Sequence, residues 1–317
     1  MAFIKLRYFW ILLALLGVAA LCLPGQVSDV RSKRMFAHER DVETSFVWEG
    51  IPRWDGGKLV GCVHNHSSGP VIFTMDREGR RDEIVFSLAH GAMIHIIGFA
   101  ASPSGEIALA GSALGADNRG ASFVARISAD RERQTITRTY PYGPSAVTFT
   151  PDGNIWTIGN LNNEAGTDLI ARNVLRRFDS SGKMLGSTTL QVLGSKTAET
   201  SFLRASLDRV GWFTRDGEYL EFSLDGAEIA RYAGPEGAGV DSRNITGLVL
   251  SEDNEVVAGH FGGGKAEFVV LDRLQRTWNP VSVAKERALT WTYVLGIDGN
   301  TLVTFSSNGR MGRFKTR

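Results

Sequence analysis

Short apolar runs alternate with polar turn residues along the chain after residue 26. Each run is four to six residues long and rich in Val, Ile and Leu, which is typical of buried strands. The clearest runs are Lys58–Val63, Glu106–Ala110, Asn154–Ile158, Val210–Thr214, Glu255–Ala258 and Thr301–Phe305. No segment of ten or more residues after Gln26 combines a 3.6-residue apolar period with helix caps. The pattern therefore predicts an all-β protein.

One turn returns at a nearly constant interval. It is clearest at Trp54-Asp55-Gly56-Gly57, Ser102-Pro103-Ser104-Gly105 and Thr150-Pro151-Asp152-Gly153. With weaker copies marked by Arg209, Asn254 and Gly299, the steps are 48, 48, 56, 45 and 45 residues. A second turn follows in the repeats, and its aspartates are Asp76, Asp130, Asp179, Asp225 and Asp272. Strand repeats of this length predict a six-bladed β-propeller whose blades are four-stranded antiparallel sheets.

The sixth repeat has room for only three strands before Arg317. A missing outer strand would leave a sheet edge unpaired, and propellers avoid this by closing the ring. The segment Lys33–Arg40 precedes the first repeat and is the natural candidate for that strand. We therefore predict a ring closed by an N-terminal strand, with the propeller spanning 33–317.

The third repeat resembles a known family. The segment Gly143–Trp156 is similar to the opening of an NHL or streptogramin-lyase-like repeat, and Arg177–Leu185 is similar to its closing strands. The other repeats match at the turn and in their apolar spacing. The resemblance implies the six-bladed propeller superfamily, which distantly includes SMP-30-like lactonases. Where those lactonases carry Asn-Gly at the start of an inner strand, this chain has Pro144-Ser145. The resemblance therefore bears on the fold more than on the activity.

Charge and cysteine content narrow the class of protein. The 35 basic and 34 acidic side chains give a net charge of +1, and no basic stripe with interleaved aromatics is present. This balance argues against a nucleic-acid partner. Cys22 lies in the N-terminal apolar segment, so a processed chain would keep only Cys62, which we interpret as a small buried residue.

The N-terminus has the pattern of an export signal. Lys5 and Arg7 precede the uncharged stretch Tyr8–Leu23, which ends at Pro24-Gly25. We predict a signal peptide or a membrane anchor at 1–25, a linker at 26–32, and a propeller exported to the periplasm or the extracellular space. Any membrane contact would be made through an uncleaved N-terminal helix.

Loop lengths and polar residues point to one end of the predicted ring. The segments Gly111–Ser122 and Gly159–Asn173 are predicted as long polar loops between the second and third strands of neighbouring repeats. Five of the six histidines fall at or near the same end, and imidazole serves as a metal ligand or as a general base. The candidate ligand-binding residues are His64, His66, His90, His95, Asn118, Asn160, Arg243, Asn244 and His260.

Competing structural explanations exist for several of these residues. His95 sits in the apolar run Met93–Ile97, which also suits a core or channel-lining histidine. The glycines of Gly259–Lys265 have the spacing of a phosphate-binding loop. However, Ala266 stands where that motif has Ser or Thr, and the segment that follows is strand-like, whereas the motif is followed by a helix. The sequence contains no complete metal-binding motif such as H-E-x-x-H, and it does not indicate which cofactor, if any, the protein binds.

Three functions remain open from the sequence. The first is a non-enzymatic module that binds a polypeptide or a small molecule through the loop face at the channel mouth. The second is a metal-assisted hydrolase or a lyase that uses His64, His66, His95 or His260 as ligand or base. The third is an envelope scaffold held by its N-terminal helix.

Overall fold

A computed structural model describes residues 35–43, 52–65, 69–89, 91–115, 119–165, 168–191, 202–214, 217–235, 245–262, 265–283, 292–306 and 310–316. The segments 1–25 and 26–32, for which a signal or anchor and a linker are predicted, lie outside this part of the chain. All the regular elements described are strands, apart from turns and one short 3₁₀ position, so the prediction of an all-β propeller is confirmed. Within the described residues no helix has the length and apolarity needed to cross a membrane.

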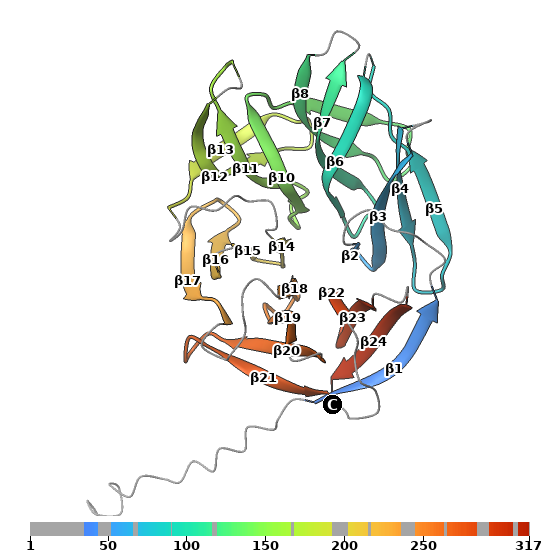
Figure 1. Cartoon of the computed structure of the whole chain (residues 1–317), viewed down its shortest axis with the longest axis vertical. Coiled ribbons are helices and arrows are strands. Elements are labelled where there is room, and N and C mark those ends of the chain that lie inside the picture. Colours follow the sequence, from blue (N-terminus) through green and yellow to red (C-terminus); the bar gives the residue numbers. More distant parts are fainter. Residues whose placement is uncertain are drawn as a thin grey trace, which may run out of the picture. The chain divides into compact units, whose positions relative to one another are not determined.

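The blades follow one another along the chain and around the ring (Figure 1). Blades 1 to 3 contain β2 (Arg53–Asp55), β3 (Lys58–Asn65), β4 (Gly69–Met75), β5 (Arg81–Val85), β6 (Gly91–Ala101), β7 (Ile107–Gly115), β8 (Gly120–Ile127), β9 (Gln134–Arg138), β10 (Tyr142–Phe149), β11 (Ile155–Asn162), β12 (Leu169–Phe178) and β13 (Met184–Thr189). Blades 4 to 6 contain β14 (Phe202–Ala205), β15 (Arg209–Phe213), β16 (Glu218–Ser223), β17 (Glu228–Ala233), β18 (Ile245–Leu250), β19 (Val256–Gly262), β20 (Lys265–Asp272), β21 (Thr277–Val283), β22 (Thr292–Asp298), β23 (Thr301–Ser306), β24 (Arg310–Thr316) and β1 (Met35–Glu43).

The N-terminal strand closes the ring, as predicted. β1 pairs antiparallel with β24 from Phe36 opposite Thr316 to Glu43 opposite Arg310. Figure 1 shows β1 lying along β24 at the outer edge of the last blade. This pairing satisfies a sheet edge that would otherwise be open.

The strand pairing gives five sheets where six separate ones were expected. Four sheets have four strands each, and the fifth has eight in the order β18-β19-β20-β21-β1-β24-β23-β22. The cause is a short parallel contact, in which Met35 and Phe36 of β1 pair with Ser282 and Val283 of β21. The eight-stranded sheet is therefore two four-stranded units joined at their outer strands by the closing strand.

The recurring turns have the geometry that their residues predict. The amide of Gly105 donates to the Ser102 carbonyl at 3.0 Å, and that of Gly153 donates to the Thr150 carbonyl at 2.9 Å. Gly105 has φ +92° and Gly153 has φ +78°, a backbone region that glycine enters without steric cost. At the second turns, Oδ1 of Asp179 accepts hydrogen bonds from the amides of Ser181 and Lys183.

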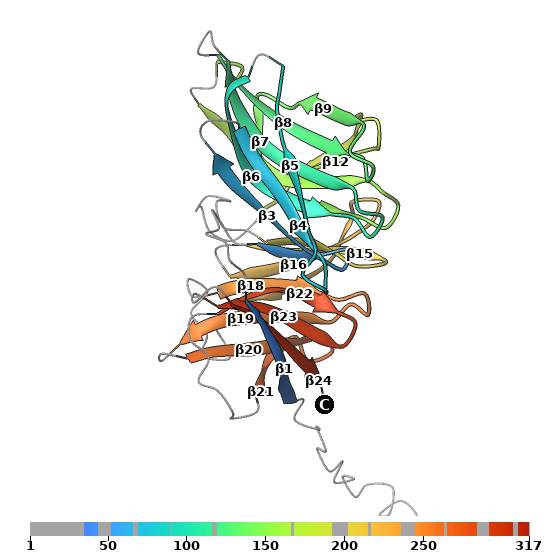
Figure 2. The same cartoon turned by 90° about the vertical axis from the view of Figure 1, so that its right-hand side faces the viewer.

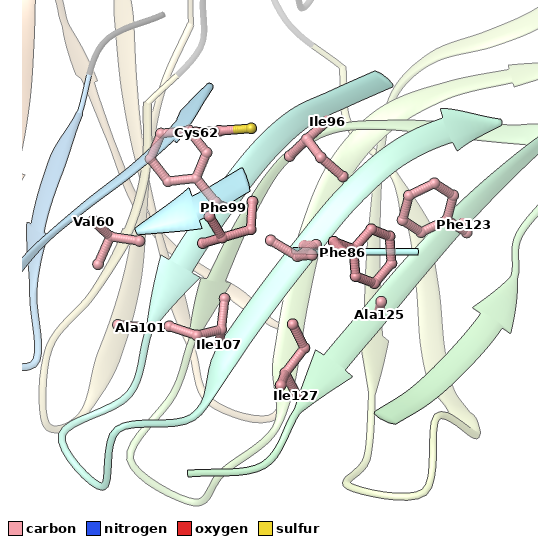
Figure 3. Close-up of a cluster of buried hydrophobic side chains, with 12 residues drawn as sticks. Val60, Cys62, Phe86, Ile96, Phe99, Ala101, Ile107, Phe123, Ala125 and Ile127 are labelled. Carbon is pink, nitrogen blue, oxygen red and sulfur yellow. The ribbon is translucent and has the colours of Figure 1, made fainter. Parts of the chain in front are cut away.

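The hydrophobic core lies between adjacent blades. The cluster between blades 1 and 2 joins Val60, Cys62 and Ile72 to strands β6, β7 and β8 (Figure 3). Phe86, in the crossing between these blades, stacks on Phe123 with ring centroids 5.6 Å apart. Cys62 is buried in this cluster, as its interpretation as a small apolar residue requires. Each blade thus covers one apolar face of its neighbour, which is why a single repeat could not fold alone.

Inner strands approach one another closely near the axis, and glycine permits this. A Cβ on Gly247 of β18 would lie 2.2 Å from the carbonyl oxygen of Val294 in β22. A Cβ on Gly296 of β22 would lie 2.3 Å from the carbonyl oxygen of Trp54 in β2. Both neighbouring atoms belong to the backbone, so the absence of a side chain on Gly247 and Gly296 allows the inner strands to lie this close together.

Candidate functional site

The antiparallel blades give the ring two ends. The turn rim carries the first turns, at Asp55, Ser102, Thr150, Ser206 and their equivalents in blades 5 and 6. The loop rim carries the connections from second to third strands, and all predicted site residues were assigned to this end or to the neighbouring crossings. Figure 2 shows the ring from the side, with β6 and β7 extending toward the loop rim.

The structure describes three of the predicted site side chains. His95 lies on β6, Asn160 on β11 and His260 on β19. For His64 the backbone lies in β3 beside Pro70 of β4. His66, His90, Asn118, Arg243 and Asn244 lie outside the described residues.

His260 is a buried histidine held between two strands. It pairs with Ile245 of β18 on one side and with Glu267 of β20 on the other. Its Nε2 lies 3.4 Å from Oε2 of Glu267, and the residue is 5% exposed. Burial lowers the pKa of His260, and the nearby Glu267 carboxylate opposes this effect only in part. The imidazole is therefore neutral over more of the physiological pH range than a histidine in water.

Asn160 has an amide oxygen without a hydrogen-bond partner. The residue lies opposite Gly143 in the β10–β11 register, near the loop rim of blade 3. Its Oδ1 is buried and accepts no hydrogen bond from any described residue. Such an atom is uncommon in folded proteins, so Asn160 is a polar group available to a ligand.

His95 lies on a strand with an unusual apolar surface. It is exposed on β6 opposite Ser112 of β7. Its neighbours Met93 and Ile97 are 64% and 46% exposed, so two large apolar side chains lie at the surface beside it. The β6–β7 register shifts between Ile96 and Gly98, and this irregularity lies beside the exposed Ile97. His95 is therefore not a core residue, and its position on the inner strand β6 is compatible with the other expectation, a channel-lining histidine.

The two predicted long loops are for the most part strands. β7 and β8 stay paired to Leu114 opposite Gly120, and β11 and β12 stay paired to Asn162 opposite Leu169. Backbone hydrogen bonds stabilise these ladders whatever the side-chain polarity, so polar composition alone wrongly indicated loops. The extended β11–β12 hairpin also carries Ile170, which is 65% exposed.

Sequence analysis missed a charged cluster on the inner strands at the turn rim. Arg53 of β2 donates from Nη1 to the carbonyl oxygen of Val147 in β10, at 2.6 Å, and contacts Thr148 Oγ1 at 3.5 Å. Its Nε lies 2.8 Å from Oδ2 of Asp55. Arg204 of β14 is buried as well, and its Nη1 donates to the carbonyl oxygen of Leu203 at 3.1 Å.

The signal that was missed is the position of the two arginines within their repeats. Arg53 and Arg204 each stand two residues before the first turn of their repeat, where a small or apolar residue stands in most others. An arginine inside a buried inner strand is expensive unless it is paired, and this could have marked both residues.

A second buried charge joins blades 4 and 5. Glu221 of β16 is completely buried and accepts hydrogen bonds from Arg209 Nη1 at 3.0 Å and from Arg273 Nε at 3.0 Å. The Arg273 Nη2 also contacts Glu221 Oε1. Burial, with the Glu221 charge adding to it, raises the pKa of the neighbouring Tyr219 well above its usual range. Glu221, Arg209 and Arg273 bind one another within the blades, so this cluster connects the two blades at their interface.

The described residues contain no group of three or more His, Cys, Asp or Glu side chains placed to hold a metal ion. His95 and His260 belong to blades 2 and 5, with other blades between them in the ring. The metal-assisted hydrolase or lyase remains a prediction. Of its four candidate histidines, the side chains of His95 and His260 are described and those of His64 and His66 are not.

Comparisons with known proteins establish similarity in fold. No family model matches the chain, and no curated protein matches it by sequence. A luciferin-regenerating enzyme structure is 13% identical over 86% of this chain and 92% of its own, with a TM-score of 0.52. A chain from a mitotic checkpoint complex is 10% identical over 88% of this chain and 95% of its own, with a TM-score of 0.49. The likeness to the luciferin-regenerating enzyme, at 13% identity, concerns the fold alone. The NHL resemblance remains a prediction.

Proposed function

We propose that this protein is a binding module that recognises a polypeptide at the loop rim of blades 2 and 3. The observation that carries the proposal is the exposed apolar stretch of β6, where Met93 and Ile97 flank the exposed His95. Exposed apolar side chains grouped on one surface commonly mark a site of protein contact.

The neighbouring blade extends the same surface. β6 packs beside β10, and the β11–β12 hairpin of that blade presents Leu169 and Ile170 at the same end of the ring. Asn160, with its unpartnered amide oxygen, lies on β11 between these apolar groups and the body of the blade. Apolar side chains could contribute affinity and the amide could fix the orientation of a bound chain. An open strand surface of this kind suits an extended polypeptide.

The proposal is tested by selecting binding peptides from a random library displayed on phage, with the immobilised propeller as bait. Selected peptides are then titrated against Met93→Ser and Ile97→Ser. Each substitution removes a side chain whose burial is worth about 1.5–3 kcal/mol, so affinity should fall roughly 10- to 100-fold. The matched control is Leu274→Ser, which changes a fully exposed leucine in the β20–β21 turn at the other end of the ring.

The control variant should bind with wild-type affinity. Peptides that bind all three variants equally would show that recognition lies elsewhere. A selection that enriches no peptide at all would also contradict the proposal.

A further inference from the structure

The inner strands carry a second candidate site at the opposite end of the ring. The six residues two positions before the first turns form one layer around the axis: Arg53, Ala100, Thr148, Arg204, Val249 and Gly296. Only three of them have polar side chains. Ala100 and Val249 pack into the clusters between blades, and Gly296 has no side chain. The two arginines come from blades 1 and 4.

Arg204 is buried without adequate partners. It is 8% exposed, and its Nε is a buried donor with no hydrogen-bond acceptor among the described residues. Its one described hydrogen bond runs from Nη1 to the carbonyl oxygen of Leu203, the preceding residue of the same strand. A guanidinium presents five N–H donors, so this bond leaves most of its capacity unused.

Charge in the layer is unbalanced. The charges acting on Arg204 are those of Arg53, which repels it, and Asp55, which attracts it. Asp55 is already the ion-pair partner of Arg53, at 2.8 Å. Two cations and one carboxylate leave a single positive charge in a region sheltered from water, which is costly unless an anion joins it.

Three other carboxylates at the turn rim pair with different arginines. Asp298 pairs with Arg313 at 3.1 Å, and Glu106 pairs with Arg126 at 2.8 Å. Asp208 pairs with Arg209 at 3.0 Å. None of these described groups is therefore placed to neutralise Arg204.

We propose that Arg204, supported by Arg53, binds the carboxylate of a small anionic molecule at the turn rim of the inner strands. A carboxylate supplies one negative charge, which equals the excess in the layer, and its two oxygens match the Nε and Nη donors of a guanidinium. Thr148 Oγ1, 3.5 Å from Arg53 Nη2, adds a hydroxyl beside the same cations. This site is separate from the loop rim, and neither proposal depends on the other.

Thermal unfolding in sodium acetate against sodium chloride at matched ionic strength tests the site. Acetate should raise the Tm of the wild-type protein as its concentration increases, because a ligand that binds only the folded state stabilises it. Arg204→Met keeps an unbranched side chain about as long as the aliphatic part of arginine and removes the guanidinium with its charge, so the apparent affinity for acetate should fall at least about tenfold. The control Arg231→Met alters a partly exposed arginine that pairs with Glu218 and Glu228, and it should retain the acetate response.

Three outcomes would overturn the proposal. The first is an equal Tm in acetate and chloride, and the second is an acetate response that survives in Arg204→Met. In the third, sodium phosphate stabilises the protein while acetate does not, which would mean that the bound group is not a carboxylate.

A second measurement, made on the wild-type protein, keeps the proposal testable if Arg204→Met misfolds. The Nε–H resonance of Arg204 in the wild-type NMR spectrum, assigned by its loss in Arg204→Lys, should shift during an acetate titration. A resonance that stays in place at saturating acetate would rule out direct contact.

Discussion

The buried Glu221 cluster should be the electrostatic contact that contributes most to joining blades 4 and 5. Glu221→Gln keeps the shape of the side chain and removes its charge. The carboxylate accepts charge-assisted hydrogen bonds from Arg209 and Arg273, each worth about 1.5–3 kcal/mol. Their sum is an upper bound, because the two arginine side chains are 20% and 25% exposed and can regain some hydration. Arg209 also keeps its pair with Asp208. We therefore expect a loss of about 2–4 kcal/mol in the free energy of unfolding.

Equilibrium urea unfolding followed by tryptophan fluorescence measures this loss, with the buried Trp212 of the adjacent strand β15 as a local reporter. The control is Glu228→Gln on β17, whose partner Arg231 lies at the surface 2.9 Å away. A surface pair of this kind should contribute less than about 1 kcal/mol and should weaken in high salt. The Glu221 effect should persist in high salt. Equal losses in the two variants, or a Glu221→Gln loss below about 1 kcal/mol, would refute the reasoning.

Two further predictions concern the axis and the buried histidine. Gly247→Ala should lower the free energy of unfolding by about 1–3 kcal/mol, because its Cβ would meet the carbonyl oxygen of Val294. Gly120→Ala, with open space around its Cβ position, should stay within about 1 kcal/mol of wild type by thermal unfolding, and equal effects would contradict the role assigned to the axis. The pKa of His260 is lowered by burial, so the unfolded chain takes up a proton below about pH 6.5 that the folded protein resists, and stability should fall as the pH drops through this range. His260→Gln should flatten that dependence in urea titrations at several pH values, and an unaltered pH dependence in this variant would contradict the role assigned to His260.

Local signals in the sequence determined the blades and their order. The glycine three residues after Ser102 or Thr150 favours a tight turn wherever the segment lies, because glycine has no Cβ and tolerates positive φ in any surroundings. Apolar runs of strand length between such turns then repeat often enough to indicate a ring. The closing role of the N-terminal segment also followed from the sequence, because the last repeat was one strand short and an open edge is unfavourable.

Tertiary structure alone decided what the inner strands bring together. Arg53 contacts Val147 from 94 positions away, and nothing local in either segment indicates the contact. The strand pairing of residues 111–115 and 159–162 was equally invisible, because a backbone ladder does not require apolar side chains. Periodicity reports which residues are buried against a neighbouring blade. The position of a charged or polar group around the axis depends on the closure of the whole ring, which is a long-range property of the fold.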